Sequence, residues 1–235
     1  MTARALAAAV ALALPGCVVV DTDPGPTETY TQDIDVGAAE TARVDIQMGT
    51  GDLSIESGGG KKLVASTFRY AARLGRPDIH YEVRQSEGRL TIEPPRNRFS
   101  TGHSSNEWQL RFGDSVPLEF NVQVGAGKSE IDLSHLPVRL IDIQMGAGKL
   151  DLNLAGRYRQ DVIVSVQGGV GQAAITLPRD FGAIADVKGG IGAIQPGTLE
   201  RRNGRFVNRA YEEGKPALRL TVRGGIGEVR LSEGN

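Results

Sequence analysis

The stretch VGAGKSEIDLS at residues 124–134 contains the residue types that most resemble a chemical site. Two glycines followed by a lysine and a serine end the loop that holds phosphate groups in many nucleotide-binding proteins. That loop also needs a glycine five residues before Gly127, where this chain has Val122, and a helix after the lysine. The residues after Lys128 alternate between apolar and polar, as in a strand. The pattern therefore argues against a phosphate loop and predicts a turn within β structure.

Histidines and aspartates are the other side chains that could carry chemistry. The three histidines lie in separate segments without the close spacing of a zinc site: His80, His103 and His135. A row of carboxylates could bind calcium or supply an acid and a base, and five aspartates recur at outward positions of the repeats described below: Asp45, Asp52, Asp132, Asp142 and Asp151. Their polar neighbours follow no consistent order, and the calcium-binding G-G-x-G-x-D nonapeptide is absent. We interpret them as a solvated face and predict no catalytic, cofactor-binding or metal site.

The composition is that of a globular protein, but with an unusually high content of glycine and few aromatic residues. The chain has 235 residues and a formal net charge of −1, which gives no reason to expect nucleic acid as a partner. It contains 31 glycines, while aromatic residues make up only 5%. The core must therefore consist mainly of Val, Ile, Leu and Ala, and the glycines indicate many tight turns.

The N-terminal residues resemble an export signal. Residues 1–16 contain one arginine and a short apolar run, ALAAAVALALP, which is too short to span a bilayer but typical of a signal peptide. The sequence LPGC at residues 14–17 resembles the lipobox of bacterial lipoproteins, which implies cleavage before Cys17 and acyl chains on that residue. In the alternative, an ordinary signal peptide leaves Cys17 as a free thiol. Because Cys17 is the sole cysteine of the chain, it can form no internal disulfide.

The predicted domain organisation follows from this anchor. Residues 17–32 are polar after the first few positions and rich in Pro, Thr and Asp, so we expect a flexible tether that begins at the lipidated cysteine. Residues 33–115 are predicted to form an N-terminal part, and residues 116–233 to form β-repeats.

Six segments share one pattern of alternating apolar residues interrupted by G-x-G. They are residues 44–57, 120–134, 140–154, 162–178, 185–199 and 218–232. The first glycines of four consecutive repeats are spaced by 21, 23 and 21 residues: Gly125, Gly146, Gly169 and Gly190. A period of this length with strand-type alternation is typical of a solenoid in which each repeat covers the apolar edge of its neighbour. The sequence thus predicts an all-β, solenoid-like stack of short strands with G-x-G corners.

The alternation changes phase at each G-x-G. In the repeat at residues 140–154, Ile143, Met145 and Ala147 have the same parity, yet the next inward residue is Leu150. The step from Ala147 to Leu150 is three residues, whereas a flat strand requires an even step. One extra residue is therefore expected at each corner, where glycine accepts positive φ and lets backbones stack closely.

Two segments interrupt the repeats. Residues 94–109 are predicted to form a polar loop in which Arg96, Arg98 and Phe99 could make a contact site, while Trp108 begins the next strand and packs inward. In residues 199–215, Asn203-Gly204 predicts a hairpin that projects from the stack or covers its end.

Taken together, these segments resemble the toast-rack domains of bacterial envelope proteins, which overlap with the LiaF-like cell-wall-active antibiotic response family and the adhesin repeat family. The resemblance is carried by residues 44–70, 77–95, 108–112, 117–136 and 204–211 and covers roughly residues 33–233. It implies a β-solenoid-like stack, no catalytic residues and a location in the cell envelope. LiaF-like proteins also carry transmembrane helices, in place of which this chain has the predicted lipid anchor at Cys17.

Two classes of function remain open. The first is a non-catalytic envelope lipoprotein that displays a β surface for another envelope protein or for its own copies, or has a structural or stress-response role. The alternative is a protein that binds or cleaves polysaccharide at the cell surface. Both imply attachment to a membrane through Cys17, on the outer membrane if the cell has one and otherwise on the outer face of the cell membrane.

Overall fold

The computed structural model describes residues 25–95 and 106–234. Apart from a 3₁₀ turn at Ala72–Leu74, their regular structure consists of 13 strands in one mixed sheet. The strands are β1 (Thr27–Asp35), β2 (Thr41–Ser57), β3 (Lys62–Ala71), β4 (Asp78–Arg84), β5 (Glu87–Glu93), β6 (Asn106–Phe112), β7 (Leu118–Asp132), β8 (Val138–Asn153), β9 (Val162–Pro178), β10 (Ala183–Gln195), β11 (Glu200–Arg202), β12 (Arg205–Val207) and β13 (Leu218–Gly234). The predicted all-β fold is confirmed.

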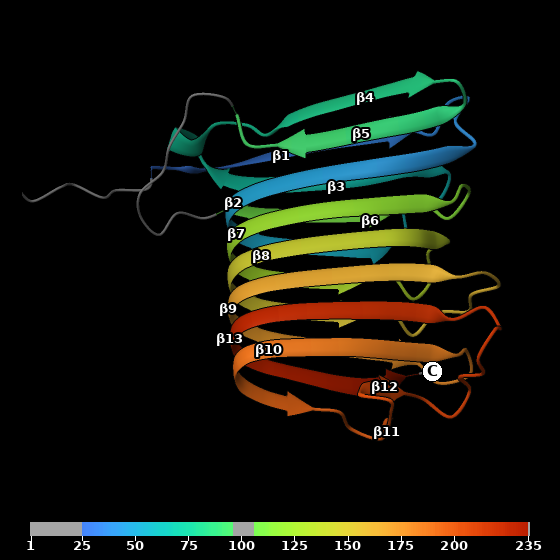
Figure 1. Ribbon diagram of the computed structural model, residues 1–235. Helices are drawn as coiled ribbons and strands as arrows, with labels where there is room; N and C mark the ends of the chain where they lie inside the picture. The colour runs from blue at the N-terminus through green and yellow to red at the C-terminus, as the bar shows by residue number, and fades with distance from the viewer. Residues whose placement is uncertain (1–24, 96–105, 235) are drawn as a thin grey trace, which may run out of the picture.

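Six long strands bend back on themselves and form the body of the sheet. They run parallel to one another in the spatial order β2, β7, β8, β9, β13, β10. Each runs along a first layer, bends at its G-x-G sequence and returns along a second layer (Figure 1). The strands are 13 to 17 residues long, so the G-x-G lies inside a strand and the predicted short strands are wrong. The structure shows one large mixed sheet and does not show the predicted solenoid.

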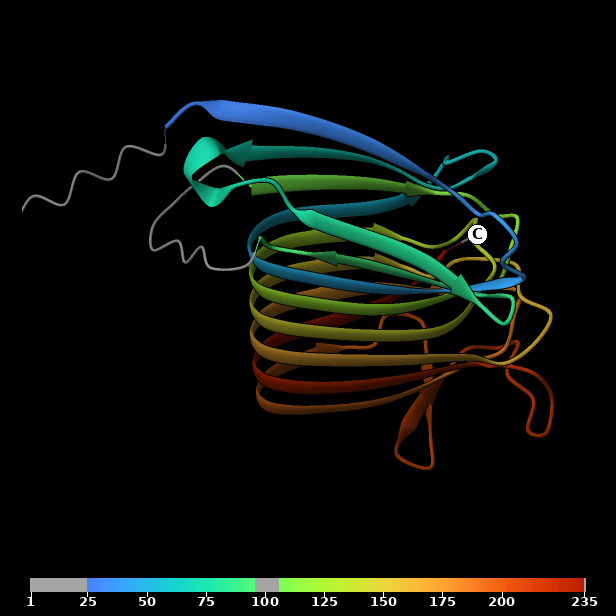
Figure 2. The ribbon, with the colours of Figure 1, turned by 90° about the horizontal axis from the view of Figure 1, so that it is seen from above.

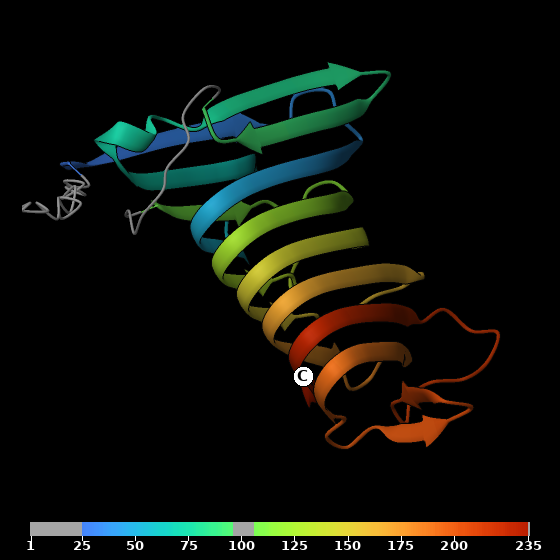
Figure 3. The same cartoon turned by 60° about the vertical axis from the view of Figure 1, so that its left-hand side comes forward.

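The spatial order departs from the sequence order at the C-terminal end of the sheet. β13 lies between β9 and β10 and pairs in parallel with both, as Figures 1 and 3 show. The even spacing of the glycines along the chain does not reveal this insertion. Residues 179–182 therefore connect β9 to a strand that is two positions away in the sheet.

At its other end the sheet divides into two arms. The first half of β2 pairs with β5, which pairs with β4, whereas the second half of β2 pairs with β6, which leads to β3 and β1. The two arms extend the two layers past β2 (Figure 2). One cluster of buried hydrophobic residues runs through the arms and the six bent strands.

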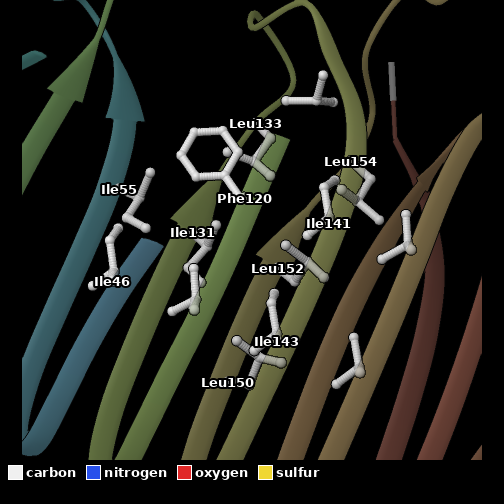
Figure 4. Packing of buried hydrophobic residues seen from close by; sticks show 14 of the residues in the cluster. Ile46, Ile55, Phe120, Ile131, Leu133, Ile141, Ile143, Leu150, Leu152 and Leu154 are labelled. Carbon is white, nitrogen blue, oxygen red and sulfur yellow. The ribbon is translucent and has the colours of Figure 1, made fainter. Parts of the chain in front are cut away.

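This core lies between the two layers. In β8, Ile143 and Met145 are buried before the bend, and Leu150 and Leu152 are buried after it. Figure 4 shows such side chains from neighbouring strands meeting between the layers. The predicted change of phase is confirmed, but Ala147 is exposed and does not face the core as predicted. The alternation is thus interrupted over the whole G-x-G.

The bend depends on direct backbone stacking between neighbouring strands. A Cβ atom added to Gly146 would lie 2.3 Å from the carbonyl oxygen of Gly125. One added to Gly148 would lie 1.9 Å from the carbonyl oxygen of Gly127, and Gly148 also has a φ of +131°. No real side chain fits at such distances, and L-residues rarely adopt that φ. The predicted role of glycine at the corners is confirmed.

The inward packing predicted for Trp108 is also confirmed. Its side chain is 1% exposed, its ring meets Phe68 edge-on at a centroid distance of 5.5 Å, and its Nε1 donates a hydrogen bond to Asn106 Oδ1 at 2.8 Å. The proposed contact residues of the same loop lie outside the described residues: Arg96, Arg98 and Phe99.

The predicted hairpin is formed by β11 and β12. Asn203 and Gly204 connect them with φ values of 50° and 79°, as a tight two-residue hairpin turn requires. β12 pairs with β10 only at Ile184 and Ala185, so the hairpin covers the start of β10 and not the whole end of the stack. Figure 3 shows it at the end of the sheet opposite the two arms.

Candidate binding surface

Parallel pairing in register places equivalent residues of the repeats side by side. Gln47, Gln123, Gln144 and Gln167 each stand two residues before the first glycine of the bend, in β2, β7, β8 and β9. Neighbouring strands are about 4.8 Å apart, so the four side chains form a line across roughly 15 Å of the sheet. We call these four residues the glutamine row.

The amides of the glutamine row are available to a ligand. All four side chains are exposed on the outer face of the first layer. Within residues 25–95 and 106–234, none of the four amide groups has a hydrogen-bond partner. Each amide can donate two hydrogen bonds and accept two. The row is therefore a set of equivalent hydrogen-bonding groups on a rigid sheet.

A shallow groove of about 800 Å³ follows the glutamine row. The four amides line it together with the backbone of the first glycines of the bends, because these glycines leave no side chains there. Pro94, next to β5, also lines the groove, as does Arg223 on β13. The groove runs across the strands and touches five of them: β2, β7, β8, β9 and β13.

The neighbouring outward row contains a carboxylate that is paired with cationic and hydrogen-bonding side chains. Asp45 accepts hydrogen bonds from Asn121 Nδ2 at 3.1 Å, Arg43 Nε at 3.3 Å and Arg89 Nε at 3.2 Å. Partial burial alone would raise the pKa of Asp45, but these hydrogen bonds and the charge of Arg43 outweigh it, so the pKa is lowered from 3.8. A carboxylate that is held ionised by three donors is a poor proton donor or acceptor near neutral pH.

The lowered pKa predicts that Asp45 stabilises the protein only when it is ionised. Its contribution is present above the unfolded-state pKa near 3.8 and is lost as the pH falls through the lower folded-state pKa. We expect the contribution to be no more than about 1 kcal/mol, since the side chains of Arg43 and Arg89 are 39% and 54% exposed and the ion pairs are screened by solvent. Urea unfolding of the wild type and of Asp45→Asn at pH 7 and pH 3 measures it. The difference between the two proteins should be larger at pH 7 than at pH 3, and a constant difference would contradict the explanation.

The bend divides the predicted row of aspartates between two faces. Asp45 and Asp142 lie on the outer face of the first layer, while Asp52, Asp132 and Asp151 lie on the outer face of the second. The five aspartates therefore do not converge on one site. Among the described residues, no group of three or more His, Cys, Asp or Glu side chains is placed to hold a metal ion.

The other sequence candidates are also dispersed. His80 is exposed on β4, and its Nε2 lies 4.0 Å from Glu82 Oε2. His135 is exposed in the loop between β7 and β8, and His103 and Cys17 lie outside the described residues.

Lys128 and Ser129 do not form a phosphate loop. They belong to strand β7 and point to opposite sides of it: Lys128 is exposed with its Nζ 2.5 Å from Glu130 Oε1, and Ser129 is 1% exposed. A phosphate loop requires a helix after the lysine. The prediction that this stretch is a turn in β structure is confirmed, because Gly127 lies in the bend of β7.

Sequence reasoning missed the glutamine row, although a signal was present. The motif Q-x-G-x-G occurs at residues 47–51, 123–127, 144–148 and 167–171. Along the sequence, the outward positions of the repeats form one mixed set, and only the register of the strands separates this row from the variable rows beside it.

The fold and this surface define a class of all-β proteins built around a bent sheet with an open polar face. Residues 23–176 match the family described as the N-terminal domain of toast_rack, DUF2154, and the chain belongs to this family. The predicted family is therefore confirmed. Among the described residues, no helix has the length and hydrophobicity needed to cross a membrane.

Solved structures extend the comparison. A "putative cell adhesion protein" from Clostridium sporogenes is similar with a TM-score of 0.83 and 26% sequence identity, covering 89% of this chain and 100% of that chain. A "putative adhesin" from Bacteroides fragilis aligns over 88% of this chain and 97% of that chain, but at 12% identity and a TM-score of 0.32, which is too low to establish a common fold. No curated protein matches the sequence.

Proposed function

We propose that this protein is a non-catalytic envelope lipoprotein that displays its bent sheet for binding at the cell surface, in the manner of an adhesin. The glutamine row carries this proposal, since it presents unpartnered hydrogen-bonding groups on an open and rigid face. The similarity to a structure named as a cell adhesion protein supports the same role.

The lipid anchor belongs to the proposal. Cys17 lies outside the described residues, and the sequence LPGC carries the argument for its acylation. The described chain begins shortly before β1, which lies in an arm at the end of the sheet opposite β10 and the hairpin (Figure 1). A tether that enters there would hold the body of the sheet away from the membrane and leave the glutamine row accessible. An outer-membrane location is proposed if the cell has such a membrane.

A polysaccharide-cleaving enzyme is the less favoured alternative. Glycoside hydrolysis uses two carboxyl groups on opposite sides of the scissile bond, one of them with a raised pKa. Beside the groove, Asp45 is held ionised by hydrogen bonds from Asn121, Arg43 and Arg89 and by the charge of Arg43, and its pKa is lowered. The described residues that line the groove include no carboxylate.

Cellular fractionation and crosslinking test this function. The wild type should label with a palmitate analogue, remain with the envelope and crosslink to an envelope component, whereas Cys17→Ala should lose all three properties. A mature N-terminus with an unmodified Cys17, or one that begins elsewhere, would disprove the anchor. Release of sugar products from purified envelope polysaccharide by the wild-type protein would disprove the non-catalytic role.

A further inference from the structure

We propose that the groove along the glutamine row binds a linear, uncharged polysaccharide that lies across the strands with about one sugar unit per strand. The inference rests on the proposed binding function and assigns a ligand class to it. No nucleophile or acid–base pair is needed, because the site only binds.

The regular repetition of the row favours a ligand that is itself regular. The four amides recur at the spacing of the strands, about 4.8 Å. This step is close to the advance of one pyranose unit along an extended glycan. A globular partner of unrelated fold would present no matching repeat, and a peptide strand normally adds to the edge of a sheet rather than across its face. A polymer of similar sugar units is the occupant that matches both the spacing and the direction of the groove.

The chemistry of the groove also suits sugar hydroxyl groups. An amide that donates and accepts can bind two neighbouring hydroxyls, each of which also donates and accepts. The four amides are exposed and have no partner among the described residues, so no internal hydrogen bond has to break on binding. The first glycines of the bends leave backbone as the lining, which gives the C–H face of a sugar ring room for close contact.

The charge of the groove favours an uncharged polymer. The glutamine row is neutral over four strands, and a positive charge appears only where β13 and β10 continue it with Arg223 and Lys188. Both cations are near Asp186: Arg223 Nη2 lies 3.3 Å and Lys188 Nζ 3.9 Å from its Oδ2. An anionic polymer would therefore gain little electrostatic attraction along most of its length.

Isothermal titration calorimetry of the purified full-length protein with linear oligosaccharides tests the inference. The probes are length series from disaccharide to octasaccharide of β-1,4-linked glucose, β-1,4-linked N-acetylglucosamine and β-1,3-linked glucose, with oligogalacturonate as the anionic comparison. For at least one neutral series, the affinity should rise with length and level off near five sugars, because five strands line the groove. Oligogalacturonate should bind more weakly than the neutral series.

Substitutions locate the site. Loss of one amide should weaken binding by about fivefold, the equivalent of one net hydrogen bond, and Gln123→Ala combined with Gln144→Ala should weaken it by about 25-fold. Gln172→Ala is the matched control, since Gln172 is also an exposed glutamine but lies beyond the bend on β9. All these positions are exposed, so melting temperatures should stay near that of the wild type.

Three results would overturn the inference: no binding of any neutral series, affinity that does not depend on length, or equal weakening by Gln172→Ala. The proposed function fails by a different test. If the anchored protein still crosslinks to an envelope protein but binds no oligosaccharide, the ligand class is wrong and the binding role stands. If the protein binds oligosaccharides but is not lipidated, the anchor is wrong and the groove stands.

Discussion

Replacing Gly148 with alanine is expected to destabilise the protein by about 3 kcal/mol or more. The added Cβ would lie 1.9 Å from the carbonyl oxygen of Gly127 and 2.9 Å from Met145 Cε, so backbone of two strands would have to separate. Alanine would also be forced into a φ of +131°, which by itself costs on the order of 1–3 kcal/mol. Urea unfolding followed by circular dichroism measures the loss.

Gly168→Ala is the matched control for this prediction. Gly168 stands directly before the bend of β9, where an added Cβ would meet no atom within 4 Å. Its substitution should change the free energy of unfolding by no more than about 0.5 kcal/mol. Equal losses in Gly148→Ala and Gly168→Ala would contradict backbone stacking as the reason for the glycines.

Replacing Asn208 with alanine is expected to destabilise the protein by about 2–4 kcal/mol. The side chain is 2% exposed, and its Nδ2 donates to the carbonyl oxygens of Pro178 and Phe181, both at 2.8 Å. Its Oδ1 accepts a hydrogen bond from the backbone N–H of Ala183 at 2.9 Å. Alanine would leave three backbone groups without this partner, and each unsatisfied buried group costs about 1–3 kcal/mol before the site relaxes. Urea unfolding gives the free energy, and hydrogen exchange should show faster exchange at Ala183.

Asn208→Asp separates hydrogen bonding from packing, because it keeps the size of the side chain. The carboxylate can still accept from Ala183 but would face the oxygens of Pro178 and Phe181 with no hydrogen to donate. Its folded-state pKa should therefore be raised, and the variant should gain stability relative to the wild type as the pH falls through that pKa. Wild-type stability in Asn208→Ala, or no pH-dependent gain in Asn208→Asp, would contradict this account of the hydrogen-bond network.

The sequence by itself determined the local features of this protein. The period-two alternation identified the strands and most of their inward residues, including Trp108, because side chains of a strand alternate between its faces wherever it packs. The G-x-G motifs located the bends, since glycine alone tolerates the φ of residues such as Gly148. Asn203-Gly204 located the hairpin for the same conformational reason. Each of these features is set by residues that are close together in the sequence.

The tertiary structure alone decided which repeats are neighbours and which side chains they bring together. The insertion of β13 between β9 and β10 and the division of the sheet at β2 depend on pairing between distant segments, which a local pattern does not encode. Because of the bend, Asp45 lies on the outer face of the first layer and Asp132 on the outer face of the second, although both occupy outward positions of the alternation. Strand register gathered the four residues of the glutamine row into one line. An outward-facing polar side chain becomes part of a site only when particular residues of the neighbouring strands lie beside it. The pairing of strands that are distant in the sequence determines which residues those are.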